Sequence, residues 1–261
     1  MLPQRDLLVG SQHPKELAAV LAAADQALRT WEPVWTGFVD GGVREEATER
    51  LGALAELTLT STGGYPGAER QRLLVQRSDA ALDLEAGAAG LMGLEISGNF
   101  LFDPAERSDF RAGLLALGPP EEALGDIWVR GDRGGQAVVT AEQAAALDGR
   151  TTSVRTVEVR LEARPLDQLQ LPAQRQPRRF QTVEASLRLD AVASAGFGIS
   201  RNRMAELIRQ GSVRVNWQPI SSPSRLLVAG DRVQLEGRGE LQLEAVQATK
   251  RERWRIQLVR C

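Results

Sequence analysis

Hydrophobic residues at helical spacing mark the start of the chain. In HPKELAAVLAAADQALRT (residues 13–30), the apolar stripe of an amphipathic helix consists of Leu17, Val20, Leu21, Ala24 and Leu28. A second helical stretch runs from Arg44 to Leu57, and the Gly and Pro residues of STGGYPGAERQR then predict a loop. No Lys-Ser/Thr pair follows the two glycines, so the signature of a nucleotide-binding loop is absent. We predict a mainly helical unit over residues 1–75.

Strand and helix patterns alternate in the middle of the chain. GLMGLEIS and GNFLF are typical of strands, ERSDFRAGLLALG of a helix with Phe110, Leu114 and Leu117 on one face, and DIWVRG and GQAVVT of two short strands. AEQAAAL is helical, and SVRTVEVRLEA alternates as one strand with the apolar series Val154, Val157, Val159 and Leu161. This βαββαβ order predicts a ferredoxin-like domain over residues 76–165, a class that includes RNA-recognition modules.

The predicted middle domain offers few groups for reading bases. RNA-recognition modules stack bases on strand aromatics, but the candidate strands provide only Trp128 and the pair Phe100 and Phe102. No basic-Gly-aromatic signature accompanies them. We therefore expect this domain to pack or to dock a protein. The stretch PLDQLQLPAQRQPRRF follows, and its three prolines predict an extended linker over residues 166–180.

The stretch GFGISRNRMAELIRQGSVRVNW (residues 196–217) combines an amphipathic helix with a short strand. Ser200 is a good N-cap, and Gly211 lies where a left-handed residue would end the helix. The expected buried positions are Met204, Leu207 and Ile208 in the helix and Val213 and Val215 in the strand. The opposite side then presents a positive ridge made of Arg201, Arg203, Arg209 and Arg214.

Charge is distributed unevenly along the 261 residues. Residues 175–261 carry 16 Lys and Arg against 8 Asp and Glu, a net +8, whereas residues 1–174 carry 16 against 26, a net −10. A basic module attached to an acidic remainder is typical of nucleic-acid-binding proteins, although two solvated faces of different charge would give the same count.

The chain lacks the residues that internal disulfide bonds, Cys-based metal sites and the common catalytic nucleophiles require. The chain has one cysteine, Cys261, and one histidine, His13, so it offers no internal disulfide, no Cys-based metal site and no His-assisted nucleophile of the usual kind. No run approaches the roughly 18 apolar residues needed to span a bilayer, and MLPQRDLLVG lacks the apolar core of a signal peptide. We expect a cytoplasmic protein without cofactor, metal or catalytic residues.

The C-terminal part resembles a known RNA-binding domain, named after small-subunit ribosomal protein S4 and here called the S4 domain. The resemblance covers residues 187–243. Its matching positions are Leu189-Asp190, Ser200-Arg201, Leu207-Ile208, Gly211, Val213, Val215, Asn216 and Gly230-Asp231 before Val233. It implies an S4-type α+β domain over residues 181–261 that binds structured RNA, usually ribosomal RNA or tRNA, and no DNA. The implied RNA-binding residues are Arg188, Ser200, Arg201, Asn202, Arg203, Arg209, Gln210, Arg214, Asn216, Trp217 and Arg225.

Motifs further upstream narrow the resemblance. GGYPGAERQR and ERSDFRAGLLALGPPEEALGDIWV, followed by a C-terminal S4 domain, resemble YlmH-like proteins and their cyanobacterial and plastid relatives, the photosystem II S4 domain proteins. Glu106, Arg111 and the pair Pro119-Pro120 depart from the family pattern of the second motif. The resemblance implies a non-catalytic factor that acts in translation or its quality control, with the large ribosomal subunit or a stalled translation complex as partner.

Two other classes of function are weighed beside this one. Pseudouridine synthases carry S4 domains and a catalytic Asp in an Arg-Leu-Asp context, which LRLDAV would supply as Asp190, but no catalytic domain follows here. Tyrosyl-tRNA synthetases also end in an S4 domain, but their histidine-bearing signature cannot be built with His13 alone. The third class is a photosystem or membrane-surface assembly factor that would use the basic ridge on anionic lipid, and it lacks an apolar anchor.

Overall fold

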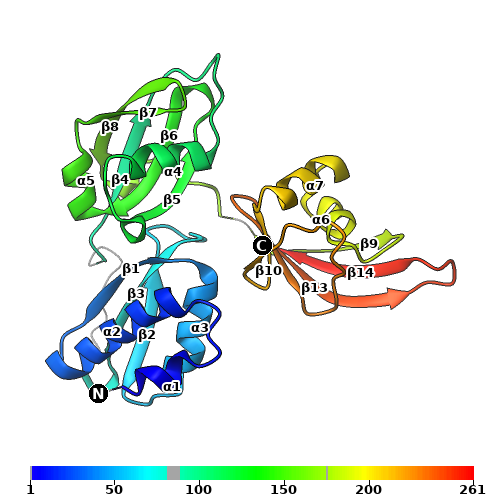
Figure 1. Cartoon of the computed structure of the whole chain (residues 1–261), viewed down its shortest axis with the longest axis horizontal. Coiled ribbons are helices and arrows are strands. Elements are labelled where there is room, and N and C mark those ends of the chain that lie inside the picture. Colours follow the sequence, from blue (N-terminus) through cyan, green and yellow to red (C-terminus); the bar gives the residue numbers. More distant parts are fainter. Residues whose placement is uncertain (1, 81–88, 175) are drawn as a thin grey trace. The chain divides into compact units, whose positions relative to one another are not determined.

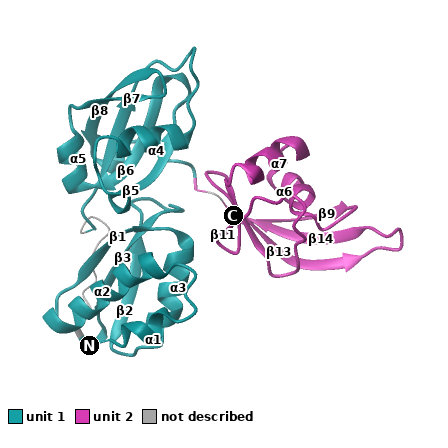
Figure 2. Ribbon diagram, in the orientation of Figure 1, with its two compact units in different colours: residues 1–173 teal, residues 174–261 magenta. Residues whose placement is uncertain are grey.

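A computed structural model describes residues 2–80, 89–174 and 176–261 of the chain (Figure 1). It divides into two compact units, residues 1–173 and residues 174–261 (Figure 2). The division falls within the predicted 166–180 linker, and both predicted N-terminal domains lie in the first unit. Their boundary at residue 75 stays a prediction. In the described ranges, no helix combines the length and the hydropathy that a membrane span requires.

The N-terminal half of the first unit packs helices on a small sheet. In chain order its elements are α1 (Gln4–Leu8), α2 (Pro14–Thr30), β1 (Val34–Val39), α3 (Gly41–Gly52), β2 (Leu57–Thr62), β3 (Gln71–Arg77) and η1 (Ser78–Ala80). The strands form an antiparallel sheet in the order β1-β3-β2. The predicted stripe of α2 is confirmed, with Leu17, Leu21 and Ala24 fully buried. The sheet itself was not predicted. The sequence pattern predicts a helix and a glycine-rich loop in this region, whereas the structure has β2 before that loop and β3 after it.

The second predicted helix differs at both ends. It begins at Gly41 because the Asp40 carboxylate caps it, accepting a hydrogen bond from the Val43 backbone N–H at 3.1 Å. It ends at Gly52, and Leu57 opens strand β2 instead of closing the helix.

The C-terminal half of the first unit has the predicted ferredoxin-like topology. Its elements are β4 (Leu91–Ser97), α4 (Arg107–Leu115), η3 (Glu121–Ala123), β5 (Leu124–Val129), η4 (Gly131–Arg133), β6 (Gly134–Thr140), α5 (Ala141–Leu147), β7 (Thr151–Val154), β8 (Val157–Arg164) and η5 (Leu166–Gln168). The antiparallel sheet has the order β5-β6-β4-β8-β7, so β7 is an edge strand added to the four-stranded core. One face packs against α4 and α5 through Phe110, Leu114 and Leu147.

Two strand predictions in this half were wrong. SVRTVEVRLEA forms the hairpin β7–β8 instead of one strand, because the chain reverses at Arg155, whose φ is +54°. Asp103 fixes this reversal by accepting hydrogen bonds from Arg155 Nε at 2.7 Å and from the Thr156 hydroxyl at 2.6 Å. GNFLF is a loop, in which the Asn99 side chain accepts from the Leu101 backbone N–H.

The other face of the ferredoxin-like sheet is covered by the protein itself. Leu169 lies directly over Gly93, where a Cβ would come within 2.6 Å of the leucine side chain. Trp128 is buried in the same cluster as Leu169 and Phe38, and its indole N–H donates to the Gln170 carbonyl at 3.1 Å. The aromatic side chain that an RNA-recognition module would expose for base stacking is therefore engaged in packing here.

The second unit is a curved sheet with two helices on one face. Its elements are β9 (Arg178–Glu184), α6 (Leu189–Phe197), α7 (Arg201–Arg209), β10 (Val213–Val215), β11 (Gln218–Pro219), β12 (Arg232–Leu235), β13 (Gly239–Ala248) and β14 (Trp254–Arg260). The strand order is β11-β10-β12-β13-β14-β9, all antiparallel. Arg178 and Phe180 thus belong to an edge strand and not to the predicted linker.

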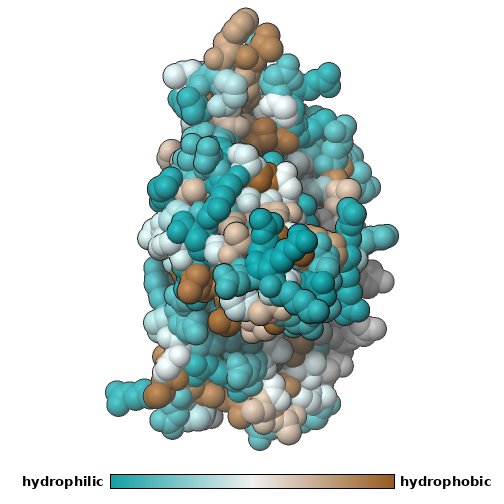
Figure 3. Space-filling view, turned by 90° about the vertical axis from the view of Figure 1, so that its right-hand side faces the viewer, coloured by the Kyte–Doolittle hydropathy of each residue, from teal (hydrophilic) through white to brown (hydrophobic). Residues whose placement is uncertain are grey.

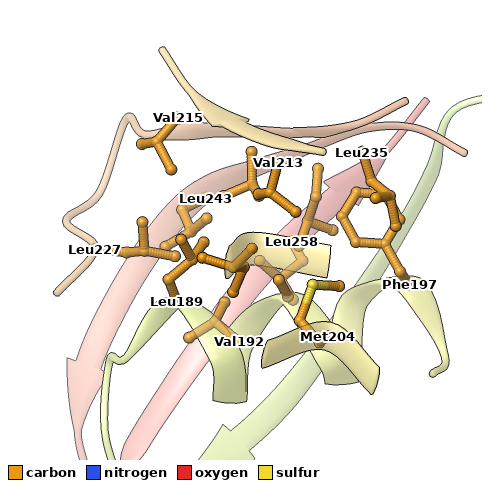
Figure 4. Close-up of a cluster of buried hydrophobic side chains, with 14 of the residues drawn as sticks. Leu189, Val192, Phe197, Met204, Val213, Val215, Leu227, Leu235, Leu243 and Leu258 are labelled. Atoms are coloured by element: carbon orange, nitrogen blue, oxygen red, sulfur yellow. The ribbon is translucent and has the colours of Figure 1, made fainter. Parts of the chain in front are cut away.

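The core of the second unit joins the helices to the sheet. Figure 4 shows Val192 and Met204 of the helices pointing toward Leu243 and Leu258 of the strands. Met204 and Ile208 of α7 are fully buried, as predicted. Leu207 is only half-buried at the edge of this core, which differs from the prediction.

Candidate nucleic-acid interface

Helices α6 and α7 are held in place by local backbone features. Gly198, with φ at +67°, ends α6, and the Ser200 hydroxyl starts α7 by accepting from the Arg203 backbone N–H at 3.3 Å. Gly211, with φ at +78°, ends α7 as predicted. The short connection fixes the N-terminus of α7 close to α6.

One buried carboxylate organises two of the predicted RNA-binding arginines. Asp190, in the first turn of α6, has a side chain only 7% exposed. It accepts hydrogen bonds from Arg188 Nε and Nη2 at 3.1 and 3.0 Å, and from Arg201 Nε and Nη2 at 3.1 Å each. Both guanidinium groups are therefore held side-on to the same carboxylate.

The two arginines remain available to a ligand. Their side chains are 40% and 53% exposed, and within the described residues neither Nη1 group of Arg188 or Arg201 has an acceptor. Burial alone would raise the pKa of the Asp190 carboxyl, but the hydrogen bonds and charges of the two arginines outweigh it, and the pKa lies below its usual value. Asp190 therefore stays ionised and acts as a positioning residue.

The remaining cations of α7 differ in their surroundings. Arg203 Nη1 lies 3.2 Å from the Glu206 carboxylate one turn along, so part of the predicted ridge is neutralised within the helix. Arg209 is exposed and makes no ion pair within the described ranges, and the neighbouring Asn202 and Gln210 are exposed as well. Arg209 is therefore the ridge residue of α7 that is most open to an external anion.

Strand β10 presents Arg214 on the face opposite the core. Val213 and Val215 are fully buried on either side of it, which confirms the predicted alternation. Asn216 and Trp217 have φ values of +49° and +68° and form the two-residue turn between β10 and β11. The Asn-Trp pair after the strand therefore has a structural role, because it forms this turn.

Asn216 has a structural role within the domain. Its amide Nδ2 donates to Asp231 Oδ1 at 2.7 Å, and its Oδ1 accepts from the Arg232 backbone N–H at 2.9 Å. The Arg232 guanidinium carbon lies 5.2 Å from the centroid of the Trp217 ring. An RNA contact by Asn216 or Trp217 stays a prediction.

The loop before β12 brings Arg225 to the same end of α6 as Arg188. The Leu189 backbone N–H donates to the Arg225 carbonyl at 2.8 Å, and Arg188 forms a β-bridge with Leu226. Arg188, Arg201 and Arg225 thus come from three separate segments to one region. The spacing of residues in the sequence did not predict that these three arginines converge. The signal that could have indicated it was the Arg-Leu-Asp run at residues 188–190.

Comparisons with known proteins agree with this architecture. The family model for the N-terminal region of YlmH matches residues 12–80, and the model of the S4 domain matches residues 187–233. The chain is 29% identical over 203 residues to the ribosome-associated protein quality control protein P2 of Bacillus subtilis (strain 168), with 77% of each chain covered.

A solved structure supports the fold alone. The cell division protein YlmH from Streptococcus pneumoniae matches with a TM-score of 0.50 and 17% sequence identity, over 60% of this chain and 93% of that one. Together, the fold and the matches define an α+β protein that carries a C-terminal S4 domain. The resemblance to YlmH-like proteins that was inferred from the sequence motifs is confirmed by the matches to the YlmH N-terminal region and to the S4 domain.

Proposed function

We propose that this chain is a non-catalytic, ribosome-associated RNA-binding protein of the cytoplasm that recognises structured ribosomal RNA or tRNA during translation or its quality control. The observation that carries the proposal is the Arg188–Asp190–Arg201 cluster on the S4 domain. Two cations oriented by one buried carboxylate suit the fixed geometry of phosphate oxygens. The match to a protein whose name places it in ribosome-associated quality control supports the ribosome as partner.

The state of Asp190 argues against the alternative of a pseudouridine synthase. Both carboxylate oxygens are engaged by Arg188 and Arg201, and the side chain is almost completely buried. A carboxylate that attacks a nucleoside must instead face its substrate. No described contact favours the third class, a photosystem or membrane-surface factor.

Salt titration of RNA binding tests the proposal at single residues. Arg209→Gln and Arg214→Gln should each weaken binding to many structured RNAs alike, because phosphate contacts position a protein without reading bases. Removing one phosphate interaction should reduce the slope of log affinity against log salt by about 0.7 to 0.9. Arg133→Gln, an exposed cation of the first unit, is the matched control and should leave the slope unchanged. Ridge variants that retain the wild-type slope would contradict the proposed surface.

A further inference from the structure

The hairpin β13–β14 extends the second unit beyond the region matched by the S4 domain model, which ends at residue 233. Its tip, residues 249–255 with the sequence TKRERWR, concentrates four cations against one carboxylate. The cations are Lys250, Arg251, Arg253 and Arg255, and the carboxylate is Glu252. None of the four was among the RNA-binding residues expected from the sequence.

The tip is a defined turn and not an irregular end. The Thr249 backbone N–H donates to the Arg253 carbonyl at 2.7 Å, and the Arg253 N–H returns a hydrogen bond to the Thr249 hydroxyl at 3.2 Å. Glu252 adopts a left-handed φ of +54°. At the base of the turn, Trp254 packs against the core and Ile256 is fully buried. The cations are therefore carried on a turn whose base is anchored in the domain.

These cations lack the internal partners that Arg201 and Arg203 of the ridge have. All four are exposed, and no ion pair joins any of them to a carboxylate within the described residues. Arg201 is paired with Asp190 and Arg203 with Glu206, while Arg179 of β9 is paired with Glu244 of β13. Like charges that are not paired with counter-charges repel one another. Binding of an external polyanion reduces this repulsion.

We propose that the tip of the β13–β14 hairpin is a second phosphate-binding site for the RNA held by the S4 domain. This inference rests on the proposed function. In Figure 1 the tip of the β13–β14 hairpin points away from β10, the strand that carries Arg214 of the ridge. The hairpin tip and the ridge therefore contact different stretches of RNA backbone. Figure 3 looks from the side toward which the hairpin extends, and its foreground carries long hydrophilic side chains.

The test neutralises the tip in the full chain. The triple variant Lys250→Gln, Arg251→Gln and Arg253→Gln keeps the backbone hydrogen bonds of the turn, which need only main-chain groups and Thr249. Its matched control neutralises three exposed cations of the first unit, Arg5, Lys15 and Arg133, in the same way. Binding of a folded tRNA transcript and of a ribosomal RNA hairpin is measured over a range of salt concentrations. Thermal melts confirm that both variants fold, and single Arg251→Gln replaces the triple variant if it does not.

The tip variant should bind RNA more weakly, with a salt slope lower by about 0.7 to 0.9 for each phosphate interaction removed, whereas the control keeps the wild-type slope. If the wild-type chain binds these RNAs and the tip variant has an unchanged slope, the hairpin site is overturned while the proposed function stands. If the wild-type chain binds neither RNA, the proposed function itself fails. Retained RNA binding together with lost binding to vesicles of phosphatidylcholine and phosphatidylserine would assign the tip to a lipid surface and overturn the inference.

Discussion

Asp190 and Arg201 come from different helices and meet through two hydrogen bonds of 3.1 Å each. The carboxylate is buried in the first turn of α6, whereas the guanidinium stands at the first position of α7 with half of its side chain exposed. The pair therefore joins the two helices and also fixes the direction of a surface cation. Because Arg188 binds the same carboxylate, one residue of the interior controls two residues of the candidate interface.

Replacing Asp190 tests this control. Asp190→Asn keeps the size of the side chain but removes the charge that holds Arg188 and Arg201, so RNA affinity should fall several-fold. The slope of log affinity against log salt should not decrease, since every cation remains. Fluorescence anisotropy with a folded tRNA transcript measures both quantities, and Asp6→Asn on the exposed face of α1 is the control.

The same substitution separates binding from catalysis. Asp190→Asn should leave the pseudouridine content of cellular RNA unchanged, because the carboxylate is engaged in ion pairs and does not face a substrate. Loss of one specific pseudouridine in cells that carry the variant would instead favour the synthase class.

Stability should depend on pH through Asp190. Its pKa in the folded protein lies below the usual aspartate value of about 3.9, so ionisation stabilises the fold above that value. The stabilisation should be complete near neutral pH and should disappear as pH falls below about 4 and through the folded-state pKa. Urea unfolding of wild type and Asp190→Asn across this range measures it. A stability difference that stays constant down to the lowest pH would contradict the ionised pair.

Two neighbouring residues of α7 should differ in their contribution to stability. Ile208→Ala should destabilise the second unit by about 2 to 5 kcal/mol, because a fully buried side chain leaves a cavity. Leu207→Ala should destabilise it less, because Leu207 is half-buried and its neighbours can adjust. Thermal and urea unfolding compare the two variants, and equal losses would show that the core reaches further around α7 than the structure indicates.

The glycine-rich motif of the first unit should act in folding. The Tyr65 hydroxyl donates to the buried Asp126 carboxylate at 2.6 Å, and the same carboxylate accepts from the backbone N–H groups of Glu69 and Arg70. Tyr65→Phe should lower the free energy of unfolding by about 1 to 3 kcal/mol and leave RNA affinity unchanged. Ser61→Ala removes an exposed hydrogen bond to Gln71 and serves as the control with a smaller effect.

Sequence patterns predicted most of the second unit and less of the first. Residues whose role depends on near neighbours were interpreted correctly, as with Ser200 and Gly211 at the ends of α7. Patterns in the first unit were ambiguous, since the alternation around Arg155 fits one strand as well as a hairpin. The bonds of Asp103 that decide between them span about fifty residues of sequence, and periodicity does not detect such contacts.

In the candidate interface, too, periodicity did not detect contacts between residues of different elements. Helical periodicity correctly separated the exposed arginines of α7 from Met204 and Ile208. It treated those arginines as equivalent, although Arg201 is paired with Asp190 and Arg203 with Glu206. Asn216 was grouped with the RNA contacts, but its amide is engaged with Asp231, a residue fifteen positions away. Side-chain pairing across elements depends on the fold, so spacing alone did not reveal it.

Whether structured RNA binds to the second unit is decided by comparing the RNA affinities of the two units with that of the full chain. The affinity of residues 174–261 for a folded tRNA transcript and a ribosomal RNA hairpin should be close to that of the full chain, because this part carries the net positive charge and the Arg188–Asp190–Arg201 cluster. Residues 1–173, which are acidic, should bind far more weakly at the same salt concentration. Equal or tighter binding by residues 1–173 would show that the RNA-binding surface does not lie on the second unit.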